Sequence, residues 1–244
     1  MTTNSESIDR REAIRRVTAL LGGVAFVGGR PLLEASERYG HARAALIAES
    51  GAGVGPFTAA DIALLDEVAD TILPPTKTPG AKAAKVGAFM AVMVTDTYDA
   101  RDQQVFRDGM AAIDEESQKT NGVAFRKATP RKRLALLREL DRQQKAHMYA
   151  LETARKARDA EKKGDAYVPD QRKEMAPAPG VNPAAAITAD SPTHYFRMMK
   201  ELTLLGYFTS EIGCTKALQY VESPGRFDPC VPYVRGTPAW APHA

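Results

Sequence analysis

The sequence predicts an all-α fold: an irregular multi-helix domain with long loops and an extended C-terminal tail rich in proline and glycine. Apolar residues recur at helical intervals in several segments, and threonine or proline stands where such segments begin. Proline-rich stretches separate them. The 244 residues, 44% of them hydrophobic, can build a core. We expect an N-terminal segment over 1–36, a linker over 37–56, a helical domain over 57–223 and the tail over 224–244.

The N-terminal segment carries the pattern of an export signal. An apolar run over 17–29 follows two basic pairs, Arg10-Arg11 and Arg15-Arg16. The run is too short to span a bilayer as a helix but fits the middle region of a signal. The pair Arg10-Arg11 resembles the signal of the twin-arginine pathway, which carries folded proteins, so we expect a periplasmic location at the inner membrane. The alternative is an amphipathic helix that begins the fold, because no clean A-x-A cleavage site follows. If retained, the segment could lie on a membrane or dock on a partner.

A modest helical stretch over 32–49 follows and ends in the sequence GAGVGP at 51–56. Its glycines do not have the spacing of a dinucleotide-binding fingerprint and no strand precedes them. We therefore interpret the glycine-rich segment as a flexible linker that precedes the folded body.

The body opens with a strong helix-start signal. Thr58 can cap a helix, and Asp61 stands three residues later. The apolar face of this helix comprises Ile62, Leu65, Ala69 and Ile72. Pro74-Pro75 ends it. After a turn at Pro79-Gly80, apolar side chains again lie at helical intervals: Ala84, Phe89, Met90, Met93 and Val94. These methionines indicate ordinary helix packing rather than heme or copper ligation.

Further helices are expected over 102–119, from Thr129-Pro130 onward and from Ser191-Pro192 onward. Between the last two, the segment 156–187 is first charged and then rich in proline and alanine, which predicts a long loop. Beyond Ser223, recurrent prolines exclude a helix, and a tail of that kind needs a surface on which to lie.

The stretch 202–233 has the composition of a binding surface, with aromatic residues beside polar residues and helix breakers. Gly206 can end one helix, and Thr209 or Ser210 can cap the next. Aromatic and arginine side chains are favoured anchors of protein interfaces. The expected partner-interface residues are Tyr207, Phe208, Glu211, Tyr220, Arg226, Phe227, Tyr233 and Trp240. Alternatively, Tyr207 and Phe208 fill the core at a helix corner, as large apolar side chains usually do.

The two cysteines, Cys214 and Cys230, flank a turn-rich segment. In an oxidising compartment this pattern predicts a disulfide, whereas in a cytosolic protein the same pair would be two buried thiols. The net charge of +3, from 33 basic and 30 acidic residues, is close to balance and gives no reason to expect nucleic acid as a partner.

No catalytic motif emerges from the sequence. The four histidines are scattered, and none pairs with another at a metal-ligand spacing of three or four. The chain contains no E-x-x-H pair, C-x-x-C, G-x-S-x-G or phosphate loop. We therefore assign no catalytic, cofactor-binding or metal-binding residue. An exported chain of this length without a recognisable site is expected to be a subunit rather than an enzyme.

Three segments carry a family resemblance: FTAADIALLDEVADTILP with the following TKTPGAKAAKVGAF, the helix start ATPRKR, and ELTLLGYFTSEIG. From about Phe57 to Tyr233 the chain resembles the gluconate 2-dehydrogenase subunit 3 family. The resemblance implies a helical, cofactor-free small (gamma) subunit. Its partner would be a large FAD-dependent dehydrogenase of the glucose-methanol-choline type, with electrons passing to a c-type cytochrome. In such complexes the small subunit carries the twin-arginine signal and escorts the catalytic subunit. The form GYFTSEIG with a Pro/Gly-rich end resembles the sugar or glucoside dehydrogenase branch.

Two other classes stay open at this stage. The chain could be an exported enzyme whose site no sequence motif reveals, or an exported helical structural or binding protein without a dehydrogenase partner. Enzymatic activity of the purified chain without a flavoprotein would indicate the exported enzyme. A co-purifying flavoprotein would exclude the structural or binding protein.

Overall fold

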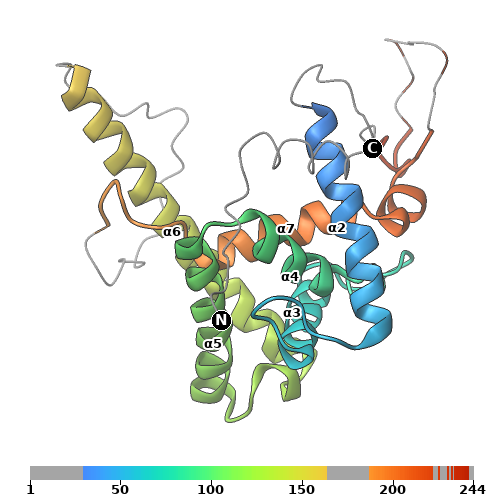
Figure 1. Cartoon of the computed structure of the whole chain (residues 1–244), viewed down its shortest axis with the longest axis horizontal. Helices are drawn as coiled ribbons and strands as arrows, with labels where there is room; N and C mark the ends of the chain where they lie inside the picture. Colours follow the sequence, from blue (N-terminus) through green and yellow to red (C-terminus); the bar gives the residue numbers. More distant parts are fainter. Residues whose placement is uncertain are drawn as a thin grey trace, which may run out of the picture.

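The chain is described here from a computed structural model. The residues that it describes are 30–163, 187–221, 225, 230, 232 and 234–241. Over these residues the structure is all-α, as the sequence predicts, and extended pairing is limited to isolated bridges. The helix α4 (Val86–Thr97) is central and packs against α2 (Arg30–Ser50), α3 (Ala59–Ile72) and α7 (Tyr195–Phe208) (Figure 1).

Helix α2 extends the folded body toward the N-terminus. The helical stretch predicted over 32–49 is confirmed, and the helix continues to Ser50, so that most of the segment expected to be a linker, 37–56, is helical. The physical reason is close packing: Gly40 and Ala44 are buried against α4 because their side chains are small. Gly51, with φ of +63°, then ends the helix.

Helix α3 begins as predicted. The hydroxyl of Thr58 accepts from the Asp61 amide at 3.2 Å, and the Asp61 carboxylate accepts from the Thr58 amide at 2.8 Å. This reciprocal pair is a capping box, which satisfies backbone donors that a helix start leaves open. The buried side chains of α3 are Ile62, Leu64, Leu65, Val68 and Ala69.

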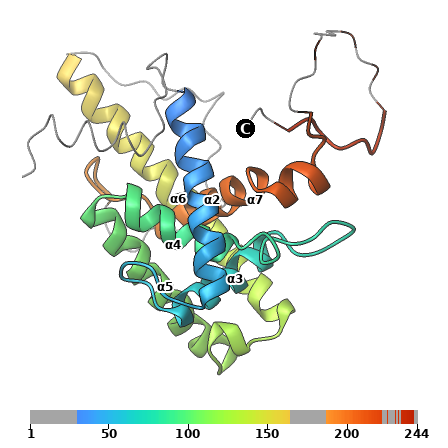
Figure 2. The same cartoon turned by 45° about the vertical axis from the view of Figure 1, so that its right-hand side comes forward.

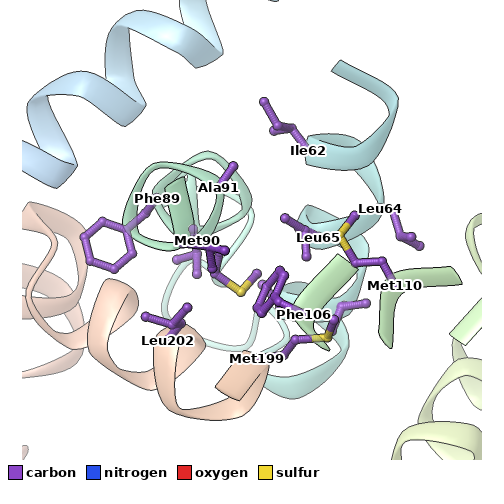
Figure 3. Packing of buried hydrophobic residues seen from close by; sticks show 14 of the residues in the cluster. Ile62, Leu64, Leu65, Phe89, Met90, Ala91, Phe106, Met110, Met199 and Leu202 are labelled. Carbon is purple, nitrogen blue, oxygen red and sulfur yellow. The ribbon is translucent and has the colours of Figure 1, made fainter. Parts of the chain in front are cut away.

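Helix α4 is buried on almost every side, which explains why its residues show little amphipathic pattern. Figure 3 shows Met90 lying toward Phe106 and Met199, in the middle of the core, and Phe89 leaving a different side of α4. The Thr203 hydroxyl lies 3.7 Å from the sulfur of Met90. The methionines therefore pack among other apolar side chains, as predicted.

Phe89 joins three helices that are far apart in the sequence. Its ring is fully buried and stacks on the imidazole of His41, with 4.4 Å between ring centroids. A Cβ atom at Gly40 of α2 would lie 3.0 Å from this ring, and one at Gly206 of α7 would lie 2.5 Å from it. Only glycine leaves room for the ring on both sides, so Phe89 fills a slot with backbone walls.

Helix α5 (Ala100–Asn121) includes the predicted helical range 102–119, and the Asp99 carboxylate caps its start. The short 3-10 helix η1 (Phe125–Lys127) then leads to α6 (Pro130–Lys163), which begins directly after Thr129, as predicted. Helix α6 spans 34 residues. Its end includes the first part of the loop expected over 156–187, and Figure 1 shows that end projecting from the body.

Helix α6 is tied to α3 and α7 by ion pairs. Arg133 and Lys82 both contact the Glu67 carboxylate of α3. Burial alone would raise the pKa of Glu67, but the hydrogen bonds from Lys82 and Arg133 outweigh it and lower that pKa. Lys200 of α7 lies 2.6 Å from the Asp141 carboxylate of α6. Helices α3 and α7 are therefore held against α6 by ion pairs as well as by packing.

The segment 188–192, which precedes α7, is held against α5 and α6. The side chains that bond it are Arg101, His147, Arg155 and Arg158. His194 then caps α7, because its Nδ1 accepts from the Phe196 amide at 3.2 Å. Burial, and to a lesser degree the nearby His147, lower the pKa of His194 to about 4. A neutral histidine therefore starts the helix at neutral pH.

Among the described helices, none has both the length and the apolar character needed to cross a bilayer. The predicted export signal, with Arg10 and Arg11, lies outside the described residues.

Candidate partner interface

The C-terminal end of α7 lies in the core. Tyr207 is only 4% exposed, and its hydroxyl donates to the carbonyl of Pro79 at 2.7 Å. Its ring meets that of the half-buried Phe208 edge to face, 5.1 Å between centroids. Tyr207 thus follows the core alternative that the sequence left open. It can support an interface from beneath but offers a partner little surface of its own.

A tight turn after α7 redirects the chain. The Ser210 hydroxyl donates to the Tyr207 carbonyl at 2.7 Å and accepts from the Gly213 amide at 3.0 Å. Ser210 is therefore the cap, one of the two residues expected to have that role. A Cβ atom at Gly213 would lie 1.8 Å from the Tyr207 carbonyl oxygen, so this position requires glycine. The one-turn π-helix η2 (Gly213–Ala217) follows, an arrangement that is frequent at functional sites.

The turn is also linked to α2. The Nε2 atom of His41 lies 2.8 Å from the Thr209 hydroxyl oxygen, and that hydroxyl donates its proton to the Leu205 carbonyl. His41 must therefore be the donor in this pair, which fixes the neutral tautomer with hydrogen on Nε2. Burial lowers the pKa of His41 and keeps the ring neutral. Sequence reasoning recorded His41 as one of the scattered histidines and missed this role.

Beyond η2, the tail returns to the body through Gln219. The Gln219 amide donates to the Ala239 carbonyl at 2.9 Å, and its carbonyl accepts from the Ala241 amide at 2.8 Å. The side-chain amide donates to the Pro238 carbonyl at 2.8 Å. These bonds form a parallel bridge between Gln219 and Trp240 and close the chain between them into a loop. No sequence pattern could have indicated this pairing, because it is made by backbone groups of distant residues.

Around this bridge the chain exposes apolar side chains. Trp240 is 61% exposed and Tyr220 is 41% exposed, and Val221 and Val234 are also exposed. Figures 1 and 2 show that this part of the chain extends beyond the helical body. Glu211 is exposed at the start of the turn. Of the predicted interface residues, Phe208 is thus the last residue of α7, and Glu211, Tyr220 and Trp240 lie on the segment that follows it.

The remaining predicted interface residues, Arg226, Phe227 and Tyr233, lie outside the described residues. Cys214 is buried in η2, with its sulfur 3.2 Å from the Phe208 carbonyl oxygen, whereas Cys230 is exposed. Their pairing stays a prediction. It is tested by a free-thiol assay of the unfolded, non-reduced chain, in which two reactive cysteines would exclude it.

Within the described ranges, no group of three metal-ligating side chains is close enough to hold an ion. One cleft of about 210 Å³ lies between α3 and α5, lined by Phe57, Asp61, Arg107 and Asp114 among others. Small-molecule sites usually have about 300–1,000 Å³. Two of its carboxylates already bond backbone amides, Asp61 that of Thr58 and Asp114 that of Phe125.

A comparison with known families decides the identity. The family described as gluconate 2-dehydrogenase subunit 3 matches the chain over residues 59–225, more than half of its length. The chain belongs to this family. Comparisons with curated proteins and with solved structures found no match. Membership indicates an accessory subunit of a dehydrogenase complex.

The limits of the match coincide with features of the fold. The match starts at Ala59, the first residue of α3, and ends at Gly225. Helix α2 and Trp240 lie outside it, yet His41 and the Gln219 bridge join both to residues inside it. Residues outside the matched range are therefore joined to the matched part of the fold by hydrogen bonds.

Proposed function

We propose that this chain is the non-catalytic small subunit of a membrane-associated, FAD-dependent sugar or glucoside dehydrogenase complex. In this proposal it scaffolds a catalytic subunit of the glucose-methanol-choline type, which holds the FAD. The observation that carries the proposal is the family match over 59–225. The packed helical body supports it, since a rigid body can present a partner-binding segment at a fixed position.

The partner contacts are assigned to the segment after α7. Contiguous exposed apolar surface marks interaction sites, and tryptophan and tyrosine are frequent hot spots of interfaces. Tyr220 and Trp240 meet this description, with Phe208 and Glu211 at the rim. Arg226, Phe227 and Tyr233, which lie between Gln219 and Trp240 in the sequence, are assigned to the same surface from the sequence alone.

Export completes the proposal. The pair Arg10-Arg11 would direct the chain to the twin-arginine pathway, with the folded catalytic subunit bound to it. This order is physically reasonable because FAD would be inserted before the complex crosses the membrane. The complex would then act in the periplasm and pass electrons to a c-type cytochrome. Replacement of both arginines by lysine should leave chain and flavoprotein together on the cytoplasmic side in a fractionation experiment.

Mild affinity purification of the tagged chain from its native cell envelope tests the partnership. We expect a second chain of flavoprotein size and the absorption bands of oxidised flavin, with dehydrogenase activity toward a sugar. A colourless protein that purifies alone would refute the proposal. It would favour an exported helical structural or binding protein instead.

A pair of matched variants tests the assigned surface. Tyr220→Ala with Trp240→Ala should lower the amount of co-purified flavoprotein at least tenfold, since one hot-spot residue contributes about 2 kcal/mol or more. Tyr39→Ala with Leu46→Ala removes two comparably exposed apolar side chains from α2 and should have little effect. Equal yields from the two variants would show that the surface is wrongly assigned, whether or not the partnership itself holds.

A further inference from the structure

One end of the molecule is strongly basic. There the C-terminal end of α5, the helix η1 and the first turns of α6 meet. We call this end the basic tip; its exposed cations are Lys119, Arg126, Lys127, Arg131 and Lys132. From 117 to 138 the sequence contains seven basic residues and no acidic one. Because the whole chain carries +3, this stretch of +7 leaves −4 for all the remaining residues.

Within the described part of the chain, the cations of the basic tip are clustered and have no carboxylate partner, whereas exposed cations without an ion pair elsewhere, such as Arg38, Lys77 and Lys216, are scattered. Elsewhere, several basic side chains of α2, α6 and α7 are paired with carboxylates; examples are Arg43 with Asp96, Arg142 with Glu139 and Arg197 with Glu201. Among the described residues, no ion pair involves any of the five tip cations, and only Lys132 makes a hydrogen bond, 3.5 Å to the Asn121 carbonyl. The tip therefore keeps its full positive charge toward an external partner.

The outward face of α6 at the tip is also partly apolar. Arg131, Leu134 and Arg138 follow one another at helical spacing and are all exposed, Leu134 by 39%. Phe125, the one aromatic residue between 117 and 138, is fully buried. The exposed surface is thus made of long cationic side chains around a leucine and lacks aromatic anchors.

We propose that the basic tip docks on the surface of a membrane rich in anionic phospholipid. Clusters of four to eight Lys or Arg residues bind anionic bilayers, and a leucine between arginines can enter the headgroup region. A protein partner is a poorer fit: the arginines of the tip would suit a protein interface, but its three lysines and its lack of exposed aromatic residues would not. Surfaces that bind single-stranded nucleic acid also use exposed aromatic side chains for stacking.

The position of the basic tip determines how the docked chain would be oriented relative to the bilayer. Figures 1 and 2 show the turn from α5 through η1 to α6 at the bottom of the molecule, and the C-terminal segment at the opposite end. A chain seated on lipid through the tip would hold its exposed aromatic segment away from the bilayer. This inference stands on the charge distribution and does not require the assigned dehydrogenase partner.

Vesicle binding of the full chain tests the proposal, with two triple variants of equal charge change. Lys127→Gln, Arg131→Gln and Lys132→Gln neutralise the tip. Arg38→Gln, Lys77→Gln and Lys216→Gln neutralise three exposed cations elsewhere. Each chain is sedimented with vesicles of phosphatidylglycerol and phosphatidylcholine, and with vesicles of phosphatidylcholine alone. Thermal unfolding verifies that all variants are folded.

We expect the tip variant to bind the anionic vesicles on the order of 100-fold more weakly, at a factor of about five per cation. The control variant should stay within about threefold of the original chain, and added salt should weaken the binding of the original chain by screening. Equal losses in the two variants would overturn the proposal, because net charge alone would then explain binding. Unchanged vesicle binding combined with loss of a co-purifying acidic protein would also overturn it and assign the tip to that protein.

Discussion

Replacement of Phe89 by alanine is expected to loosen the contact between α2, α4 and α7. Phenylalanine to alanine changes in cores cost about 3–5 kcal/mol, and the amount depends on how far the surroundings can collapse. Here the walls of the slot are backbone at Gly40 and Gly206, which have no side chains to move inward. The stack with His41 is lost as well. We therefore expect a loss in the upper part of that range, about 4 kcal/mol.

Urea unfolding followed by circular dichroism measures this loss. With a slope of about 2 kcal/mol per molar urea, the midpoint should fall by about 2 M. Hydrogen exchange should also become faster over residues 38–50, because α2 depends on this contact. Leu204→Ala is the control: this side chain lies on α7, the helix that contains Gly206, is 37% exposed and should cost less than about 1 kcal/mol. A loss below 1 kcal/mol for Phe89→Ala, or unchanged exchange over 38–50, would refute the reasoning.

Three more outcomes are expected. Gln219→Pro removes the amide that bonds Ala239, so proteolysis of the C-terminal segment should become faster while thermal stability of the body stays unchanged; an unchanged cleavage rate would contradict the bridge. Gly213→Ala brings a Cβ atom onto the Tyr207 carbonyl oxygen and should cost about 1–3 kcal/mol in urea unfolding, whereas a neutral change would show that the turn can relax. The pKa of His194 is about 4 in the folded chain and 6.5 is its ordinary value, so between these pH values the unfolded chain binds more protons. Stability should therefore be full above pH 6.5 and fall by about 1 kcal/mol as the pH drops toward 4; His194→Asn, which can still cap the helix, should remove this part of the pH dependence, and an unaltered profile would count against it.

The features predicted correctly from the sequence are those that neighbouring residues determine. Thr58 and Asp61 form a capping box within one turn, and Thr129-Pro130 precedes a helix start through the conformational preferences of those two residues. The family resemblance was likewise visible in continuous segments, and the match over 59–225 confirms it.

The features that the sequence did not reveal depend on distant contacts. A linker is predicted over 37–56 because of the glycine-rich sequence at 51–56. The burial of Gly40 within this range is explained by the ring of Phe89 on the facing helix α4. Tyr207 was expected at an interface, but the carbonyl of Pro79 gives its hydroxyl a partner inside the body. An aromatic residue with a polar atom suits both places, and only the fold decides between them.

Because charge is distributed unevenly along the sequence, we expect this nearly balanced protein to have a large electric dipole moment. With +7 over residues 117–138 and −4 over the rest, the molecule should turn in the field of a charged surface before it makes any contact. On a cation-exchange column, whose resin is negatively charged, the protein should be retained more strongly than a protein whose net charge of +3 is evenly distributed. Neutralisation of Lys127, Arg131 and Lys132 should advance its elution far more than the same change at Arg38, Lys77 and Lys216, since an adsorbing surface responds to the nearest charges rather than to their sum.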